Sequence, residues 1–300
     1  MMAMQRVMCL MGPTACGKTA AAIGMVKRGG YEIISVDSAM VYRGMDIGTA
    51  TPTAEELKIA PHRLINIRDP ADPYSVGNFC DDVQREIKDI LNNGNTPLLV
   101  GGTMMYFHQL QQGYSELPSA NAAIRQQVAQ EAKQHGWPAM HMQLQQIDAK
   151  TAEQLHPHDM QRISRALEIY YQTGKPLSVW HAEQRLKPPA YQFETVILAP
   201  DERSIIHQLI EQRFDQMLEQ GFVDEVAALY ERGDLNPNLP SIRSVGYRQA
   251  WDYCEGNIDK NTMRERAIIA TRQLCKRQFT WLRRWQGARW ITSSSELFTE

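Results

Sequence analysis

A phosphate-binding loop of the form G-x-x-x-x-G-K-[ST] occupies residues 12–19 of this 300-residue chain. An apolar run, residues 7–11, precedes the loop, and a helix-forming run, residues 20–28, follows it. In such a loop, successive backbone N–H groups point at an anionic phosphate chain at the N-terminus of a helix. The order of strand, loop and helix predicts an α/β fold built on a parallel sheet.

Each position of the loop is a candidate for binding phosphate groups. Gly12 and Gly17 permit the turn and the close approach of a ligand to the backbone. Lys18 adds a positive charge, and the hydroxyl of Thr19 suits a divalent metal such as Mg²⁺. A nucleoside triphosphate is the commonest ligand of such loops, and the loop alone leaves the ligand open. The diphosphate- or nucleotide-binding candidates are Gly12, Pro13, Thr14, Ala15, Cys16, Gly17, Lys18 and Thr19.

Composition narrows the class of protein. Apolar residues make up 43% of the chain, enough for a sizeable core, and the net charge of −2 means that any nucleic-acid signal must be local. The five cysteines never form C-x-x-C, which predicts a reduced protein without structural disulfides or zinc. No apolar run approaches the roughly 18 residues of a membrane span. We therefore expect a cytoplasmic protein with no membrane partner.

Asp37 follows an apolar run, residues 32–36, that predicts a second strand. The carboxyl ends of strands face the ligand crevice in open α/β sheets, so Asp37 should lie near the ligand of the loop. The alternative is an ordinary turn or helix-capping aspartate.

Three further apolar runs, residues 64–67, 97–100 and 195–198, predict the remaining strands. The second of these runs ends in Gly101, Gly102 and Thr103, where an ATPase of this class usually places a metal-holding Asp. Simple ATP hydrolysis is therefore disfavoured.

Residues 115–189 are glutamine-rich, with apolar positions at helical spacing, and they predict an α-helical insertion. We accordingly divide the chain into a P-loop catalytic core, residues 1–114 and 190–300, and a helical insertion domain, residues 115–189. His156 and His158 flank a proline, and a polar turn is favoured over a metal site because no further ligand lies at suitable spacing.

Basic residues after residue 200 indicate contacts with anions. Arg213, on a helix expected to start near Asp201, is either a solvated surface charge or a second phosphate ligand. A last helix is predicted over residues 260–286, and the segment from Arg264 to Arg289 holds eight Lys and Arg but a single acidic residue. At 100° per residue, an apolar side that includes Trp281 and Trp285 is opposed by a basic side, which favours nucleic acid as the partner. The basic side comprises Arg266, Arg272, Lys276, Arg277, Arg283 and Arg284.

Several motifs in order along the chain resemble those of the bacterial tRNA dimethylallyltransferase family, also called tRNA isopentenyltransferases. The resemblance implies a P-loop kinase-like parallel sheet core with an α-helical insertion domain. The motifs that carry it are residues 12–19, ISVDSA at 34–39, YRGMDIGTA at 42–50, PLLVGGT at 97–103, QRISRALE at 161–168, RSVGYR at 243–248 and ATRQL at 270–274.

The resemblance implies transfer of a dimethylallyl group from its diphosphate to N6 of adenosine 37 in tRNAs that read codons beginning with U. The implied cofactor is Mg²⁺, and the implied partners are a tRNA anticodon stem-loop and dimethylallyl diphosphate, with the protein acting as a monomer. One alternative is a nucleotide or small-molecule kinase in which the insertion closes as a lid. Another is an RNA-binding or GTPase-like module, which the absence of N-K-x-D disfavours.

By the same resemblance, Asp37 is the general base, while Lys18, Thr19 with Mg²⁺, and Arg213 neutralise the diphosphate. Cys16 stands where the family often has Ser, and Thr51 stands where Lys is common, so one positive contact with substrate is missing. The expected tRNA-contacting residues are Asp37, Ser38, Ala39, Met40, Thr103, Arg125, Gln161, Arg162, Ile163, Ser164, Arg165, Arg243, Ser244, Val245, Gly246, Tyr247 and Arg248, and the basic helix adds Lys276, Arg277 and Arg284.

Overall fold

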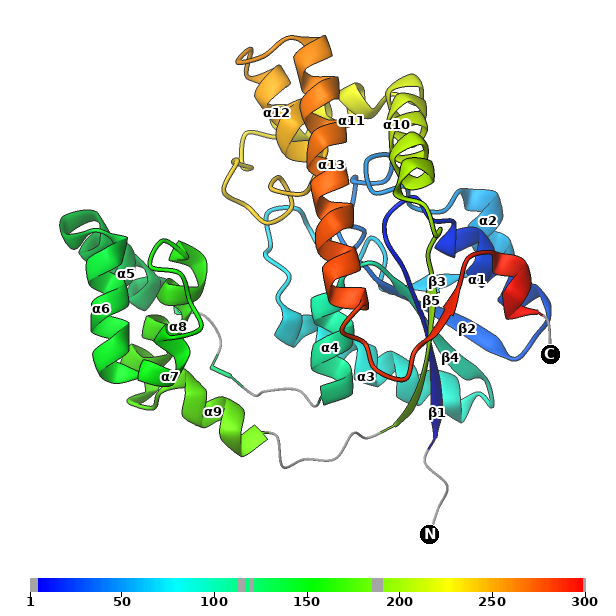
Figure 1. Ribbon diagram of the computed structural model, residues 1–300. Helices are drawn as coiled ribbons and strands as arrows, with labels where there is room; N and C mark the ends of the chain where they lie inside the picture. The colour runs from blue at the N-terminus through cyan, green and yellow to red at the C-terminus, as the bar shows by residue number, and fades with distance from the viewer. Residues whose placement is uncertain (1–4, 113–116, 119–120, 185–190, 299–300) are drawn as a thin grey trace. The chain divides into compact units, whose positions relative to one another are not determined.

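The computed structural model describes residues 5–112, 117–118, 121–184 and 191–298. The chain divides into two compact units, one formed by Met1–His108 with Tyr191–Glu300 and the other by Gln109–Ala190 (Figure 1). The division expected from the sequence lies at residues 114/115 and 189/190. We call the first unit the core and the second the helical unit.

The core is built on a parallel sheet whose described strands run in the order β3-β2-β4-β1-β5-β6. β1 lies between β4 and β5, so the phosphate loop that follows it leaves the sheet from its middle, where ligands bind in such folds. The central strands are buried on both faces and are accordingly almost wholly apolar. The strands are β1 (Arg6–Met11), β2 (Tyr31–Val36), β3 (His62–Arg63), β4 (Thr96–Gly101), β5 (Gln192–Leu198) and β6 (Arg289–Ile291).

Helices surround this sheet, and α10 to α13 lie together above its upper end in Figure 1. α13 is the longest of the described helices; it contacts α10 and α12, and Asp259 caps its first turn by accepting from the Thr262 N–H. The helices of the core are α1 (Lys18–Lys27), α2 (Ala54–Ile59), α3 (Val76–Asn92), α4 (Met104–Gln112, which continues into the helical unit), α10 (Arg203–Glu219), α11 (Phe222–Glu231), α12 (Tyr247–Cys254), α13 (Lys260–Leu282) and the 3-10 helix η1 (Ser294–Leu297).

The helical unit has its own apolar core, as the change of sequence character at residue 115 predicts. Val128, Met140, Leu144, Ile163 and Leu167 are its central buried residues. Its helices are α5 (Ala122–His135), α6 (Trp137–Ile147), α7 (Ala149–Ala152), α8 (Met160–Thr173) and α9 (Leu177–Gln184). In the part of the chain that the structure describes, no group of three or more His, Cys, Asp or Glu residues is arranged to hold a metal.

The strand predicted at residues 64–67 is wrong, because β3 is confined to the two residues before it. Leu64 has a φ of 63° and Asn66 a φ of 53°, values that an extended strand does not allow. The Asn66 N–H instead donates to the carbonyl of Met40 at 3.0 Å. Tertiary hydrogen bonding therefore overrides the strand propensity of this apolar run.

Two helix boundaries also differ from prediction. α10 begins at Arg203 rather than near Asp201, and Glu202 precedes it without a side-chain cap. α13 ends at Leu282 instead of residue 286, and Gly287, with a φ of 74°, helps to turn the chain toward β6.

Candidate functional site

The phosphate loop is shaped by close backbone contacts that only glycine allows. A Cβ on Gly12 would lie 2.3 Å from the carbonyl oxygen of Leu198 in β5. Gly17 has a φ of 86°, which brings the chain round into α1. Lys18 Nζ donates to the carbonyl of Pro13 at 2.6 Å, so its charge lies across the loop beside the N-terminus of α1.

The two glycines that end β4 are required by packing. A Cβ on Gly101 would lie 2.0 Å from the carbonyl oxygen of Val36, and one on Gly102 would lie 2.5 Å from Nε2 of Gln278. These contacts bring the ends of β2 and β4 and the last turns of α13 together. This close packing explains why β4 ends in Gly101 and Gly102, where an ATPase of this class would place a metal-holding Asp.

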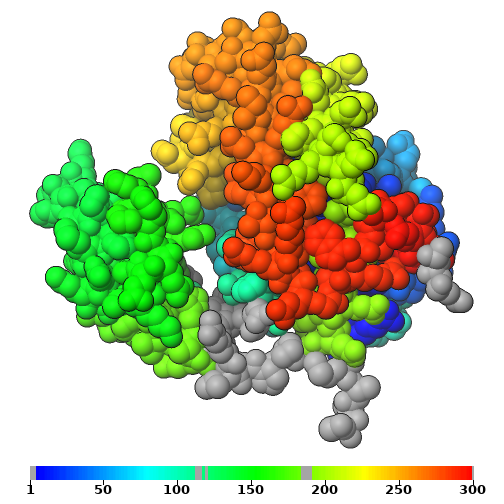
Figure 2. Space-filling model, in the orientation of Figure 1, coloured from blue at the N-terminus to red at the C-terminus, as the bar shows by residue number. Residues whose placement is uncertain are grey.

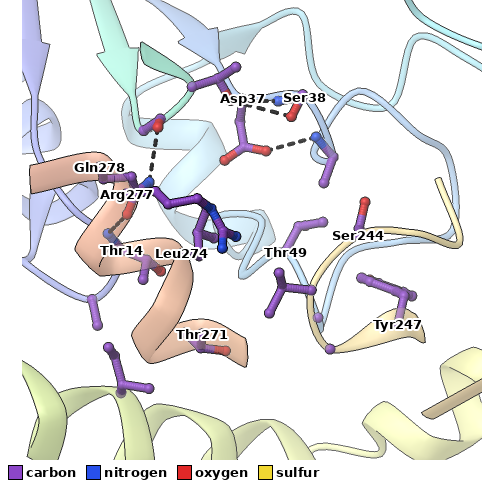
Figure 3. Close-up of a pocket in the computed structure, with 18 of the residues that line it drawn as sticks. Thr14, Asp37, Ser38, Thr49, Ser244, Tyr247, Thr271, Leu274, Arg277 and Gln278 are labelled. Atoms are coloured by element: carbon purple, nitrogen blue, oxygen red, sulfur yellow. Dashed lines mark hydrogen bonds between the residues drawn. The ribbon is translucent and has the colours of Figure 1, made fainter. Parts of the chain in front are cut away.

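Gln278 connects α13 to the loop, and the sequence interpretation missed it. Its Oε1 accepts from the Thr14 N–H at 2.9 Å, and its Nε2 donates to the Gly102 carbonyl at 2.9 Å (Figure 3). The side chain is buried. A signal was present, because Gln278 lies one helical turn after Leu274, on the side of the helix assigned to apolar residues.

Asp37 directly follows β2 and borders the same space as the loop, as its position at a strand end predicts. Its Oδ1 accepts from the Ala39 N–H at 2.8 Å and from the Met40 N–H at 3.2 Å, which fixes the orientation of the carboxylate. The hydroxyl of Thr103 accepts from the Ser38 N–H at 3.1 Å. Thr103 and residues 37–40 therefore lie together.

Arg213 of α10 also faces the space around the phosphate loop. Its Nη2 donates to the carbonyl of Thr49 at 3.2 Å. Burial lowers the pKa of Arg213, whereas the negative charge of Asp37 acts in the opposite direction. A guanidinium still carries its charge at neutral pH, so Arg213 presents a partly desolvated cation to any anion held here.

Two cavities meet at these residues. One, of about 490 Å³, has an apolar wall, and the other, of about 960 Å³, surrounds the phosphate loop. Both are lined by Thr14, Asp37, Arg213 and Gln278, so the anion-binding end and the apolar space adjoin. The apolar wall is formed by Ile210, Phe214, Met217, Phe222, Val245, Leu274 and Trp281.

The predicted RSVGYR segment precedes and begins α12, and most of it lines the apolar cavity. Arg243, Ser244, Val245, Gly246 and Tyr247 all border this space, as Figure 3 shows for Ser244 and Tyr247. Tyr247 is fully buried. The sixth residue, Arg248, is exposed and lies outside the lining.

The predicted division of α13 into one apolar and one basic side is wrong. Arg272 bonds Glu211 of α10 at 3.0 Å, Lys276 lines a separate groove beside α10, and Arg277 borders the apolar cavity. Trp281 is 37% exposed and also borders the cavity, so it is not a core residue. α13 therefore carries basic residues on more than one side, and Figure 2 shows in orange that part of this helix lies at the molecular surface. The exposed basic residues of α13 are Lys260, Arg266, Lys276 and Arg277, and Arg283 and Arg284, directly after the helix, are exposed as well.

In the helical unit, three of the predicted tRNA-contacting residues, Arg125, Ser164 and Arg165, lie around the buried carboxylate of Glu168. Arg125 Nε lies 3.4 Å from Glu168 Oε1, and the Ser164 hydroxyl donates to the same oxygen at 2.9 Å. Arg165 Nη2 donates to the Pro118 carbonyl at 2.6 Å, and burial lowers the pKa of Arg165. Of the remaining predicted residues, Gln161 and Arg162 are exposed and Ile163 is buried.

None of the helices that the structure describes is long and apolar enough to cross a lipid bilayer.

Comparison with known proteins identifies relatives along nearly the whole chain. The sequence model described as IPP transferase matches residues 40–285, and the one described as isopentenyl transferase matches residues 5–69. A tRNA dimethylallyltransferase from Coxiella burnetii is 57% identical over 290 residues, which cover 97% of this chain and 93% of the relative.

Solved structures show the same relationship. The tRNA isopentenylpyrophosphate transferase from Bacillus halodurans is similar with a TM-score of 0.70 and 35% identity, covering 96% of this chain and 90% of that one. A eukaryotic dimethylallyltransferase described as acting on tRNA is similar with a TM-score of 0.80 and 26% identity, covering 93% of this chain and 70% of that one.

Proposed function

This chain belongs to the IPP transferase family, and from that membership and its site we infer that it transfers a dimethylallyl group from dimethylallyl diphosphate to tRNA. The acceptor is N6 of adenosine 37, beside the anticodon, in tRNAs that read codons beginning with U, and the product is N6-dimethylallyladenosine. One observation carries this proposal. Asp37 and Arg213 border both the phosphate-loop cavity and the apolar cavity, so a diphosphate and a short hydrocarbon chain fit end to end beside a carboxylate.

The phosphate loop and its neighbours hold the leaving group. When the carbon–oxygen bond of the substrate breaks, its electron pair leaves with the diphosphate. The backbone N–H groups of residues 15–19, together with the positive charges of Lys18 and Arg213, stabilise that negative charge. Lys18 exchanges its bond with the Pro13 carbonyl for one with the diphosphate.

Asp37 acts as the general base. N6 of the adenine attacks the carbon that is losing the diphosphate, and its N–H becomes acidic as the N–C bond forms. The Asp37 carboxylate accepts that proton. Because Ala39 and Met40 hold Oδ1, the carboxylate keeps one orientation, and Oδ2 receives the proton.

Mg²⁺ fits the sparse set of donors at the loop. Mg²⁺ in phosphate sites is held by one or two protein groups, by waters and by the phosphate oxygens. The Thr19 hydroxyl, which borders the phosphate-loop cavity, is the protein group that would hold it. When bound, Mg²⁺ neutralises part of the diphosphate charge.

The tRNA contacts come from both units. In the core, residues 37–40, Thr103, residues 243–248 and the basic side chains Lys276, Arg277 and Arg284 meet the anticodon loop. In the helical unit, proposed as a clamp, Arg125 and residues 161–165 meet it. The target base must leave its stack, which costs a few kcal/mol and is easier in a loop than in a helix. We also propose that the protein acts as a monomer and that the reaction takes place in the cytoplasm.

Radiolabelled dimethylallyl diphosphate and an unmodified tRNA with adenosines at 36, 37 and 38 test this function. We expect label on N6 of adenosine 37 and none on a tRNA with guanosine at 37. Phosphoryl transfer from ATP to a small acceptor, with no label on tRNA, would instead identify a kinase.

A further inference from the structure

We propose that Glu225 of α11 is a positioning residue that sets the place of Arg213 by immobilising the loop of residues 46–49. This inference rests on the proposed function, because it names what holds a diphosphate-binding side chain. The observation is that one carboxylate of α11 accepts backbone hydrogen bonds from three consecutive residues of this loop.

Glu225 binds three consecutive backbone N–H groups. Its Oε2 accepts from the N–H of Asp46 at 2.8 Å and of Ile47 at 2.7 Å, and its Oε1 accepts from that of Gly48 at 3.1 Å. Successive N–H groups that converge in this way form an anion-binding concavity, which the chain's own carboxylate fills. Hydrogen bonds to an ionised acceptor are about twice as strong as neutral ones, so the loop is firmly held.

Tyr247 completes the arrangement from α12. Its hydroxyl donates to Glu225 Oε1 at 2.6 Å, and burial raises the pKa of Tyr247, so the hydroxyl stays protonated and keeps donating. A Cβ on Gly48 would lie 2.3 Å from the ring of Phe222 and 2.6 Å from that of Tyr247. The loop therefore packs against these two rings at Gly48, where a residue with a side chain would not fit.

The position of the loop determines that of Arg213 through the backbone carbonyl of Thr49. The Thr49 carbonyl accepts from Arg213 Nη2 at 3.2 Å, and Thr49 is the residue directly after the last N–H that Glu225 holds. The Thr49 hydroxyl also donates to the Met45 carbonyl at 2.6 Å, which closes the turn. A shift of the loop thus moves the acceptor that orients the guanidinium, although the hydrogen bonds of Glu225 go to the loop and to Tyr247 and not to Arg213.

Glu225→Gln removes the charge and places an amide donor where the carboxylate accepts. At least one N–H of the loop then faces another donor, so the loop shifts. We expect inorganic pyrophosphate to bind about tenfold more weakly, and KM for dimethylallyl diphosphate to rise by a similar factor. Glu231→Gln, an exposed change on the same helix, is the matched control and should leave both values within about twofold.

A double-mutant cycle with Arg213→Ala separates positioning from a general loss of structure. If Glu225 acts through Arg213, Glu225→Gln should weaken pyrophosphate binding by less than about twofold once Arg213 is absent. An unchanged tenfold loss in the Arg213→Ala background would overturn the proposal. Should Glu225→Gln fail to fold, Gly48→Ala displaces the same loop with Glu225 intact, and it must show the same dependence on Arg213.

Pyrophosphate binding by calorimetry is the decisive readout, because it needs neither tRNA nor transfer. A wild-type protein that binds pyrophosphate but labels no tRNA would refute the proposed function and leave this inference standing. Normal transfer with additive effects in the cycle would refute only the role of Glu225.

Discussion

The side-chain oxygen of Gln278 accepts a hydrogen bond from the backbone N–H of Thr14 at 2.9 Å, across 264 residues of sequence. The amide nitrogen of Gln278 donates to the Gly102 carbonyl, so both ends of one buried amide are satisfied. α13 is thereby fixed to the phosphate loop. Because Arg277, a proposed tRNA contact, is the neighbouring residue, the proposed contacts with tRNA and with diphosphate share one structural support.

Gln278→Glu should destabilise this junction. A carboxylate still accepts from the Thr14 N–H. Its second oxygen, however, faces the Gly102 carbonyl oxygen, and neither of these two acceptors has a hydrogen to share. We expect a loss of about 1–3 kcal/mol in the free energy of unfolding and weaker pyrophosphate binding. Denaturant unfolding measures the first and calorimetry the second. Gln273→Glu, an exposed change on the same helix, is the control, and an equal loss there would assign the effect to helix charge.

Asp37→Asn should slow chemistry without weakening the binding of diphosphate. The amide oxygen of Asn can still accept from the N–H groups of Ala39 and Met40, but the side chain no longer takes a proton. We expect kcat for tRNA prenylation to fall by about 10²- to 10⁴-fold, with KM for dimethylallyl diphosphate nearly unchanged. Single-turnover transfer measures this effect, and Asp81→Asn on the exposed side of α3 is the control. A kcat within a few-fold of wild type would remove Asp37 from the role of base.

The elements predicted well are those whose signal is local. The loop at residues 12–19 was identifiable from its spacing and from the apolar run before it, and Asp37 from its place at a strand end. The helical unit was predicted from composition and periodicity. In each case, neighbours in sequence determine the structure.

Gln278 and Glu225 were missed because their partners are remote in sequence. Glu225 accepts from N–H groups 177 to 179 residues away, and no local pattern marks such a carboxylate. The prediction for residues 64–67 failed for a related reason, since Asn66 bonds Met40 instead of a neighbouring strand. On α13, Trp281 was assigned to the core from periodicity alone, which does not tell a core from the wall of a cavity.

Asp148 should make the stability of the helical unit depend on pH. Burial raises the pKa of Asp148, but hydrogen bonds donated by Thr151 and Ser178 outweigh burial, so its pKa lies below the usual value. A carboxyl group whose pKa is lowered by folding contributes its full stabilisation of the folded state above its unfolded-state pKa, near 4. That contribution is lost as pH falls through the folded-state pKa.

Asp148→Asn should therefore cost about 1–2 kcal/mol at pH 7, because the bond from the Ser178 N–H to Oδ2 loses its acceptor. The difference from wild type should shrink as pH falls below about 4, and it should be smallest below the lowered folded-state pKa, where the wild-type side chain is also neutral. Hydrogen exchange of α7 and α9 at the two pH values measures it. Asp159→Asn, at the N-terminus of α8, is a comparison that keeps its acceptor for the Arg162 N–H. If the difference in stability between wild type and Asp148→Asn stayed constant with pH, the charge of Asp148 would not contribute to the stability of the helical unit.

Arg277→Ala should weaken tRNA binding and reduce its dependence on salt. Arg277 is exposed at the edge of the apolar cavity, where we propose that a phosphate of the anticodon loop reaches it. Each lost phosphate contact should lower the slope of log K against log salt by about 0.7 to 0.9. Arg264→Ala is the matched control on the same helix, because Arg264 bonds Asp215 at 2.6 Å and is already neutralised within the protein. That variant should lose stability and keep the slope, whereas an unchanged slope for Arg277→Ala would assign Arg277 to the solvent-exposed surface.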